Sequence, residues 1–583
     1  MAGVRVPSGV ARVAATVRPG GGGARTRLLL ELDLTAGLLP GPAPDLLGRV
    51  QTARALTVPG VVRALADAEQ DPTVAGLVAK VGGGRLRLAQ AQELAQAVRS
   101  FRAAGKRAWA WAETFGESGS GTPGYTLAAA FDEIWLQPSG DVGLTGVAVE
   151  ALFLRDALQR AGVEPQLEQR YEYKNAADLF LRREFTPAHR EASERLATSA
   201  LEQVVGDVAA GRSLPVDVVR ELVDRAPLPA AEALAAGLVD RLGYRHEVYA
   251  AAKDAAGDDA ALRFLAAYRR RRPPPEILRR RWSHRSTGFV ALVHAVGAIR
   301  LGRSGRTLQG SAVGADTVSA ALRAAADDDH VRAVLLRVDS PGGSYVASDT
   351  IWGALSAVRA AGKPVVVSMG ALAASGGYFI ACPADRIIAL PSTLTGSIGV
   401  LGGKPVVADL LARWGVGTDA VTAGRHARMS SIRAGYTDEE WQQLQESLDR
   451  IYTDFTGKVA AGRGLDRERV DDLARGRVWT GADALDRGLV DELGGLRRAA
   501  EIARKRAGLP TDADVRQYPH VPMLRRLRRP KSSEDIGAAA AAVLAADHVD
   551  GLLAGSVDAA SGLLDALGLT SGALLLMPPI TLR

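Results

Sequence analysis

Residues 331–344 read VRAVLLRVDSPGGS, and residues 365–378 read VVVSMGALAASGGY. Each stretch opens with a nearly continuous apolar run, which is typical of a strand buried on both faces of a parallel sheet. Between them, residues 348–361 have the apolar spacing of a helix, and Gly362 is a suitable residue to end it. A strand, a helix and a second strand at this spacing predict parallel pairing through a right-handed crossover. The sequence therefore predicts an α/β fold built from βαβ units.

Both strands lead into segments of small residues. We expect residues 370–374 to form a turn and residues 375–382 a short helix, so that Ser375 lies at a helix N-terminus. Free backbone N–H groups and the helix dipole favour negative charge there, as a tetrahedral oxyanion requires. Taken alone, Ser375 would be interpreted as a helix N-cap. Because Gly342 and Gly343 follow the preceding strand and let a ligand approach the backbone closely, the two motifs together predict an oxyanion hole.

The same unit occurs twice along the chain. Residues 74–106 align without a gap to residues 331–363, and shorter matches recur downstream, with GY at 124 and 377, VAAGR at 208 and 459, and GLVD at 237 and 488. Matches that recur at a nearly constant offset indicate a duplicated domain. Where the second copy has its glycine and serine motifs, the first has GGGRL and GTPGY. The two copies therefore differ in the residues that could carry out a reaction.

The duplication and the local composition divide the 583 residues into five segments. We predict a mobile N-terminal tail, a first repeat, an Arg/Pro-rich linker, a second repeat and an Ala-rich extension without a counterpart in the first copy, at residues 1–27, 28–268, 269–286, 287–509 and 510–583. Within the extension, residues 538–569 favour one or two helices. The uncharged stretch 566–580 is too short to span a membrane and is expected to be a buried or interfacial segment.

The composition is that of a soluble globular protein, with 47% hydrophobic and 23% charged residues. The single cysteine, Cys382, excludes an intramolecular disulfide framework. The net charge is +7, and arginines cluster at 269–272, 279–281 and 525–531, where they could contact anionic lipid headgroups. No nucleic-acid motif accompanies them, so nucleic acid is not expected as a partner. We detect no transmembrane run and no signal peptide, and expect a cytoplasmic or peripherally membrane-associated protein.

The motif run from 339 to 400 is specific enough to suggest a family. Its segments DSPGGS, SMGALAASGGY and PSTLTGSIGV together resemble peptidase family S49, of the ClpP/crotonase superfamily, in its long duplicated form. The resemblance covers roughly residues 28–509. It implies tandem ClpP/crotonase-like domains and hydrolysis of peptides by a Ser–Lys dyad, with no metal and no cofactor. In the long form of the family, the lysine comes from the first repeat.

A serine nucleophile needs a base, and no histidine lies between His330 and His426. That spacing argues against a histidine base, although His426 remains a weak candidate. In the string YEYKNAA at 171–177, Lys174 occupies the family's lysine position, and the equivalent slot in the second repeat falls at Arg425. Lys404, which is close to the serine motifs in sequence, remains a rival.

A lysine acts as a base only if its pKa falls well below the usual 10.4, and burial among apolar groups has that effect. The neighbours expected to bury Lys174 are Tyr171, Tyr173, Leu179 and Phe180. Lys106 and Lys363 lie in turns between helix and strand and are interpreted as solvated lysines.

The resemblance also assigns the remaining roles. Ser397 corresponds to a family serine that orients the lysine, and the backbone N–H groups of Gly343 and Gly376 are assigned to the oxyanion hole. In the first repeat, Arg85 and Leu86 stand opposite Gly342 and Gly343, Thr122 opposite Ser375, and Pro123 opposite Gly376. Because proline lacks the N–H group, the first copy cannot build the same hole. One site per chain, made from both halves, is expected.

The overall interpretation is a serine endopeptidase that degrades short hydrophobic peptides, such as the remnants of cleaved signal peptides. The resemblance also implies a homotetramer whose active sites face an internal groove. Two alternatives stay open: an inactive scaffold that binds peptides or membrane partners, and a crotonase-like acyl-CoA enzyme. The complete motif set shared between complementary halves disfavours the scaffold, and the string around Lys174 disfavours the acyl-CoA enzyme.

Overall fold

The computed structural model describes residues 27–43, 52, 55–83, 86–117, 119–257, 260–268, 288–307, 310–519, 572–577 and 581–582. The N-terminal tail, the linker, the Ala-rich helices expected at 538–569 and all three arginine clusters lie outside these residues or almost entirely so. Within the described part of the chain, no helix has the length and apolar character needed to cross a membrane.

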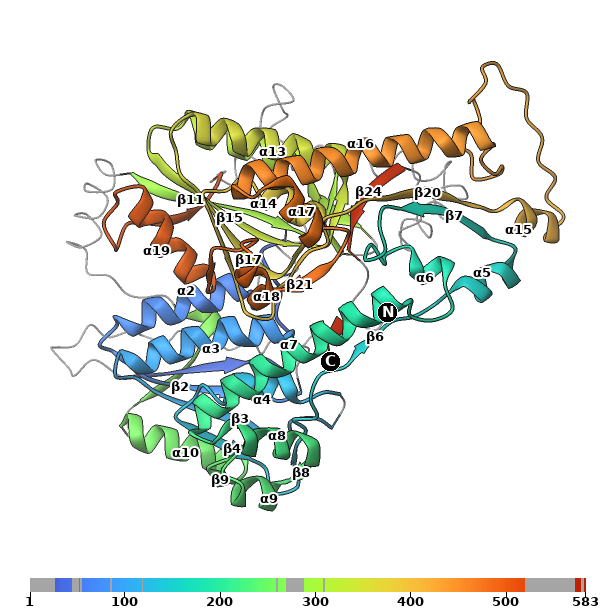
Figure 1. Cartoon of the computed structure of the whole chain (residues 1–583). Helices are drawn as coiled ribbons and strands as arrows, with labels where there is room; N and C mark the ends of the chain where they lie inside the picture. Colours follow the sequence, from blue (N-terminus) through green and yellow to red (C-terminus); the bar gives the residue numbers. More distant parts are fainter. Residues whose placement is uncertain are drawn as a thin grey trace, which may run out of the picture.

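The first copy is built on a parallel sheet with strand order β10-β1-β2-β3-β4-β9 (Figure 1). Its strands are β1 Leu28–Asp33, β2 Val74–Lys80, β3 Arg107–Ala112, β4 Glu133–Leu136, β9 Arg241–Leu242 and β10 Ala261–Phe264. The apolar core on one face includes residues of several helices, among them α2 Val58–Glu69, α3 Leu88–Ala103, α4 Thr122–Ala128 and α7 Pro187–Arg212. On the other face, three tryptophans of the sheet pack against α10 Arg245–Ala256.

The second copy repeats this sheet with the order β23-β11-β15-β17-β18-β22. Its strands are β11 Phe289–Val296, β15 Val331–Ser340, β17 Val365–Ala374, β18 Arg386–Ala389, β22 Glu492–Leu493 and β23 Val515–Gln517. Its helices are α12 Ala315–Asp327, α13 Tyr345–Ala360, α14 Gly376–Ala381, α16 Asp438–Arg463, α17 Arg467–Leu473, α18 Gly481–Asp486 and α19 Leu496–Arg506. Because both sheets connect their strands in the same order, the tandem duplicated α/β fold is confirmed.

Equivalent side chains make equivalent contacts in the two copies. The Tyr125 hydroxyl donates to the carbonyl of Leu238 at 2.6 Å, and the Tyr378 hydroxyl donates to Leu489 at 2.9 Å. Strand β23 pairs with β11 as β10 pairs with β1. The second sheet therefore extends to Gln517, past the expected limit at 509, and residues 515–517 do have a counterpart in the first copy.

One local prediction is wrong. Residues 370–374, expected as a turn, continue strand β17 up to Ala374. The register between β15 and β17 shifts at this point, and the extended end of β17 pairs with β19 Leu394–Gly396. The small residues serve close packing, because a Cβ on Gly370 would collide with the Asp339 carboxylate. The strand therefore carries the chain directly to Ser375.

A further sheet joins the two copies. Its order is β13-β14-β12-β16-β24-β20-β7, and it includes one strand of the first copy, β7, antiparallel to β20. The bounds are β7 Glu164–Gln169, β12 Ala298–Arg300, β13 Gly305–Thr307, β14 Gly310–Gly314, β16 Gly342–Ser344, β20 Leu401–Val406 and β24 Gly572–Leu576. With α5 Arg155–Ala161, α6 Asp178–Leu181 and α15 Ala408–Arg413, strands β7 and β20 project from the body as an arm (Figure 1).

The remaining elements are short. They are β5 Asp141–Val142, β6 Val149–Glu150, β8 Leu228–Pro229, β21 Val478–Thr480, β25 Thr581–Leu582, α8 Val216–Arg225, α9 Ala230–Ala235 and the 3₁₀ turn Leu265–Ala267. Strand β25 pairs antiparallel with β6, so the C-terminal end of the chain lies on the first copy.

Polar contacts hold the two copies together across a buried interface. The guanidinium of Arg337 on β15 donates to the carboxylate of Glu93 on α3 at 3.0 Å, and both side chains are buried. The same carboxylate accepts from the backbone N–H of Leu496 at 2.7 Å. The first copy is thus in direct contact with both β15 and α19 of the second.

Candidate active site

Ser375 lies at the junction between β17 and α14. Its φ of +55° and ψ of −116° belong to a region that side chains other than glycine rarely adopt. The backbone N–H of Ser375 donates to the carbonyl of Gly396 at 2.8 Å, and its carbonyl accepts from Phe379. A strained turn between a strand and a helix can present the side chain of a serine so that its hydroxyl is available for chemistry.

Lys174, from the first copy, reaches this serine. Its Nζ atom is 2.8 Å from Ser375 Oγ, 2.9 Å from Ser397 Oγ and 3.0 Å from the Ser397 carbonyl oxygen. The side chain is fully buried. Burial lowers the pKa of Lys174 well below its usual value, because the charged form loses its hydration without gaining a carboxylate partner.

The pairing of β7 with β20 brings Lys174 to the second copy. Residues 164–169 pair with residues 401–406, and the next residue, Arg170, donates its backbone N–H to the carbonyl of Val400 at 3.0 Å. The Arg170 side chain also binds Asp449 on α16. The three residues between Arg170 and Lys174 therefore start from a point held on the second copy.

The surroundings of Lys174 differ from the prediction. Tyr171 is 46% exposed, and Leu179 and Phe180 belong to a separate apolar cluster around β7. Gly476 and Gly399 make the space instead. A Cβ on Gly476 would overlap the backbone of Lys174, and one on Gly399 would lie 3.2 Å from its Cδ.

Gly476 is a functional residue that the sequence analysis missed. Its φ is +87°, and its N–H donates to the carbonyl of Ile398 at 2.8 Å. The preceding residue, Arg475, forms an ion pair with Glu172, and its carbonyl accepts from the N–H of Tyr173 at 3.2 Å. A glycine in a loop more than a hundred residues after the serine motif carries no signal that connects it with Lys174.

Ser397 holds the lysine from the side opposite Ser375. Its φ of +50° is also unusual for a residue other than glycine, and its N–H donates to the carbonyl of Arg477 at 2.6 Å. Both its hydroxyl and its carbonyl oxygen accept from Lys174. An amine has a limited number of donors, and these contacts orient the amine toward the serine.

The two glycines expected to form the oxyanion hole are neighbours in space. A Cβ built on Gly376 would lie 3.1 Å from the backbone nitrogen of Gly343 and 3.1 Å from Cα of Gly342. Gly343 has a φ of +154°, and a Cβ there would collide with the Ile299 carbonyl. Strand β16 and the first turn of α14 therefore meet beside Ser375, and only glycine fits at their contact.

The other two candidate bases, Lys404 and His426, form their hydrogen bonds with other groups. Lys404 Nζ donates to the carbonyl of Met429 at 2.8 Å and lies over the ring of Tyr436. His426 contacts the amide of Gln443 at 3.2 Å. Neither is bonded to Ser375 in the described part of the chain.

The other basic residues considered from the sequence make contacts of their own. Arg425, the second copy's equivalent of Lys174, is exposed and forms an ion pair with Glu439. Lys106 and Lys363 are not simply solvated, because each donates to two backbone carbonyls around the end of one helix and the start of the next strand: Lys106 to Asp71 and Val74, Lys363 to Ala325 and Asp328. They join helix to strand in equivalent positions of the two copies.

The described residues of the first copy hold no comparable serine site. Thr122 is buried at the start of α4, and its hydroxyl donates to the carbonyl of Gly146 at 3.0 Å. Pro123 follows it in the first turn of α4. Arg85 lies outside the described residues, while Leu86 precedes α3. The hydroxyl of Thr122 is therefore engaged in a hydrogen bond with the backbone.

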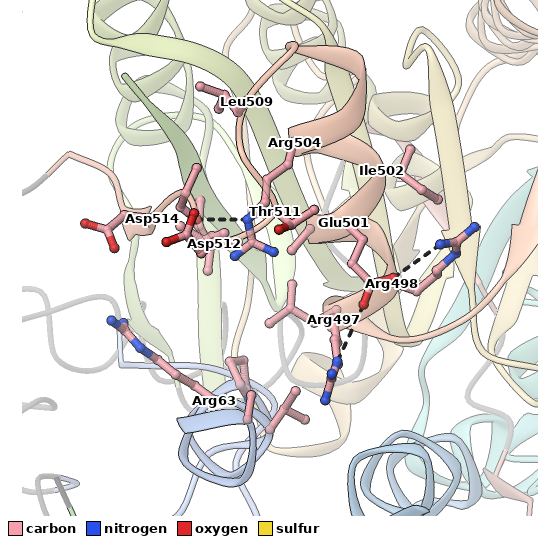
Figure 2. Close-up of a pocket in the computed structure, with 18 of the residues that line it drawn as sticks. Arg63, Arg497, Arg498, Glu501, Ile502, Arg504, Leu509, Thr511, Asp512 and Asp514 are labelled. Carbon is pink, nitrogen blue, oxygen red and sulfur yellow. Dashed lines mark hydrogen bonds and ion pairs between the residues drawn. The ribbon is translucent and has the colours of Figure 1, made fainter. Parts of the chain in front are cut away.

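A large cavity lies away from this serine. It has a volume of about 1420 Å³ between α2 of the first copy and α19 of the second, and its lining includes neither Ser375 nor Lys174. Figure 2 shows Arg497 and Arg498 directed at Glu501, with which both form ion pairs. The charged groups of the cavity neutralise one another, and it carries no nucleophile paired with a base.

A serine on a strained strand-to-helix turn, bonded to a buried lysine, is the arrangement of a serine hydrolase. The model of Peptidase family S49 matches residues 100–258 and 357–510. The chain is 34% identical to Protease 4 of Salmonella typhi over 463 residues. The aligned part makes up 76% of this chain and 72% of that protein. The protein is therefore a serine peptidase, and the chain belongs to family S49.

Two other relatives also match most of this chain and about three quarters of their own length. Protease 4 of Haemophilus influenzae is 31% identical over 469 residues, covering 79% of this chain and 74% of that protein. The chloroplastic serine protease SPPA of Arabidopsis thaliana is 27% identical over 523 residues, covering 89% and 73%. A solved structure of a ClpP1 mutant from Listeria monocytogenes matches 38% of this chain and 99% of its own, with 18% identity and a TM-score of 0.24.

Proposed function

We propose that the protein is a serine endopeptidase that uses a Ser–Lys dyad to degrade short hydrophobic peptides, such as cleaved signal peptides. The observation that carries this proposal is the hydrogen bond of 2.8 Å between Lys174 Nζ and Ser375 Oγ in a fully buried setting. Because burial lowers the pKa of Lys174 well below its usual value, its amine loses its proton more readily and can then accept one from the serine. Ser375 is then the nucleophile and Lys174 its general base.

The reaction follows from these positions. Ser375 Oγ attacks the scissile carbonyl carbon while its proton passes to Lys174, and Lys174 returns the proton to the leaving amine. The backbone N–H groups of Gly343 and Gly376 donate to the oxyanion that develops on the carbonyl oxygen. Ser397 keeps the lysine oriented. Water then attacks the ester on Ser375 while one of its protons passes to Lys174, and Lys174 returns that proton to Ser375 Oγ as the ester bond breaks.

An extended apolar peptide fits the surroundings of Ser375. Strands β16 and β20 flank a single strand position in the shared sheet, and a peptide in extended form can bind strand edges through its backbone. The nearby side chains of Leu372, Leu394 and Val478 form an apolar cluster with Ala374, the residue before the serine. Backbone pairing would give affinity for many sequences, and the apolar cluster would favour hydrophobic ones.

We also propose the assembly that the family resemblance implies, a homotetramer, and peripheral contact of the protein with anionic membranes. The projecting arm supports association, because Trp414 after α15 is 81% exposed and Val421 is fully exposed. Exposed apolar side chains gathered on one projection are typical of an interaction surface.

Labelling with a fluorophosphonate probe tests the chemistry. We expect the probe to modify Ser375, and Ser375→Ala to abolish both labelling and hydrolysis of a hydrophobic peptide ester. Lys174→Ala should lower the rate by about 10²–10⁴-fold, the usual contribution of a general base. Lys404→Ala is the matched control, since it removes another lysine of this region with a lowered pKa and should leave the rate nearly unchanged. Near-native activity of Lys174→Ala would refute the dyad.

A further inference from the structure

The strand position between β16 and β20 is occupied by the chain itself. Strand β24, residues 572–576, pairs antiparallel with β16 on one side and antiparallel with β20 on the other. Figure 1 shows β24 beside β20. The C-terminal segment therefore lies where the proposed function requires an extended peptide.

The register of this strand can be worked out from its pairing. Leu575 is opposite Gly343 and Leu576 is opposite Gly342, and the N–H of Met577 donates to the carbonyl of Pro341 at 2.9 Å. Opposite residues in an antiparallel pair alternate between hydrogen-bonded and non-hydrogen-bonded pairs. Because Met577 makes a bonded pair, Leu575 makes the next one, and its carbonyl faces the N–H of Gly343.

The same register brings the segment to the nucleophile. Gly343 adjoins Gly376, the residue after Ser375, and the buried side chain of Met577 packs in the apolar cluster that contains Ala374. The carbonyl opposite Gly343 is the one that an oxyanion hole at Gly343 and Gly376 would receive. The peptide bond aligned for attack is thus the one between Leu575 and Leu576.

We propose that the C-terminal segment 572–577, with the sequence GALLLM, is an intramolecular competitive inhibitor that occupies the peptide-binding position in the orientation of a substrate. This inference rests on the proposed function, because it takes Ser375 and Gly343 as the reacting site. The segment is apolar, as the proposed substrates are.

The structure also explains how such a segment resists turnover. After the aligned bond, the N–H of Met577 donates to Pro341 and residues 581–582 pair with β6; before it, residues 572–574 pair with β20, so the chain is held on both sides. If Ser375 displaces the amine of Leu576, that amine takes a proton from Lys174 and stays beside the new ester. Attack by a held amine is favoured over attack by free water, and the peptide bond forms again.

Truncation after residue 571 tests the inference. A tethered segment acts at an effective concentration in the mM range, so a segment that binds at about 0.1 mM would raise the apparent KM about ten-fold. We expect the truncated protein to hydrolyse a hydrophobic peptide ester with an apparent KM about ten-fold lower at unchanged kcat. The synthetic peptide GALLLMPPITL should inhibit it competitively. An equal KM in the two proteins would overturn the proposal.

Two proline variants keep the full chain and separate pairing from general disturbance. Leu575→Pro removes the N–H of a bonded pair with β16 and should lower the apparent KM as truncation does. Leu576→Pro is the matched control. Its N–H is in a non-bonded pair with β16 and lies beyond the pairing with β20, which ends at Leu574. Leu576→Pro should behave as the native chain, and equal effects of both variants would refute the register.

A binding measurement distinguishes failure of this inference from failure of the proposed function. In the truncated protein carrying Ser375→Ala, the fluorescently labelled peptide should bind saturably, and excess unlabelled peptide should displace it. No activity and no probe labelling in any variant would reject the proposed function while leaving this binding result to stand. The other outcome is that the truncated Ser375→Ala protein does not bind the peptide, while the truncated protein with Ser375 intact is labelled normally by the probe. That outcome would reject only the inhibitor proposal.

Discussion

Ser375 and Ser397 hold φ values of +55° and +50°, where side chains other than glycine are strained. Each is fixed by its own N–H, which donates to the carbonyl of Gly396 and of Arg477 respectively. The surrounding strands therefore impose the conformation, and the two hydroxyls converge on the amine of Lys174. Local strain held by neighbouring structure is a feature of reacting groups.

The lowered pKa of Lys174 has a consequence for pH dependence. The base works only when it is neutral, and its neutral fraction rises as the pH increases through the lowered pKa. We expect kcat/KM to fall on acidification, by about ten-fold per pH unit below that pKa, as one proton binds. A pH series of ester hydrolysis measures this limb, and Lys404→Ala should leave it in place. A rate independent of pH across the range where the protein is folded would contradict a lysine base.

At the scale of elements, the site depends on how loops of one copy fit against the other. Gly476 comes after α17, and its missing side chain leaves room for the backbone of Lys174. We expect Gly476→Ala to push Lys174 away from Ser375 and to lower kcat by about 10²-fold or more, since small displacements of a catalytic group have effects of that size.

The control for this substitution is Gly464→Ala. Gly464 ends α16 with a φ of +63°, so it carries a similar backbone penalty, but no atom lies within 4 Å of the added Cβ. It should lower stability by about 1 kcal/mol and leave kcat unchanged. Melting curves and ester hydrolysis together separate the two effects, and equal loss of kcat in both variants would show that only the backbone matters.

At the scale of the whole molecule, the two copies depend on one another for folding as well as for the site. Glu93 and Arg337 form a buried ion pair between them. Glu93→Gln leaves the guanidinium without its counter-charge and should destabilise the protein by about 3–5 kcal/mol. Glu172→Gln removes an ion pair between the copies that is about half exposed, and should cost at most about 1 kcal/mol. Urea denaturation compares the two, and similar midpoints would contradict the buried-pair argument.

The projecting arm bears on assembly. If the homotetramer forms through this arm, Trp414→Ser should shift the mass in solution toward smaller species, because it removes a large apolar side chain from the contact. Light scattering on a sizing column measures the change. Trp352, which is largely buried against α16, is unsuitable for this purpose, whereas the exposed Tyr244 of the first copy offers a control whose substitution should leave the mass unchanged.

Much of this could be predicted from the sequence, and for identifiable reasons. Buried parallel strands are continuous apolar runs, so β15 and the start of β17 were evident, and the repeated strings predicted the duplication. The motif around Ser375 resembled a family pattern and was found directly. The small residues at 370–374 suit both a turn and a tightly packed strand, and only the pairing with β19 decides between them.

The sequence by itself determined the fold class and the duplication, and it made Ser375, Lys174, Ser397 and the two glycines the candidate site residues, because each lies in a local pattern that resembles the family. Only the tertiary structure decided which base meets the serine, what makes room for it and what occupies the adjacent strand position. Those outcomes depend on contacts between segments hundreds of residues apart, as when Gly476 accommodates Lys174 and residues 572–576 enter between β16 and β20. No local pattern encodes such a contact, because it exists only once the chain has closed on itself.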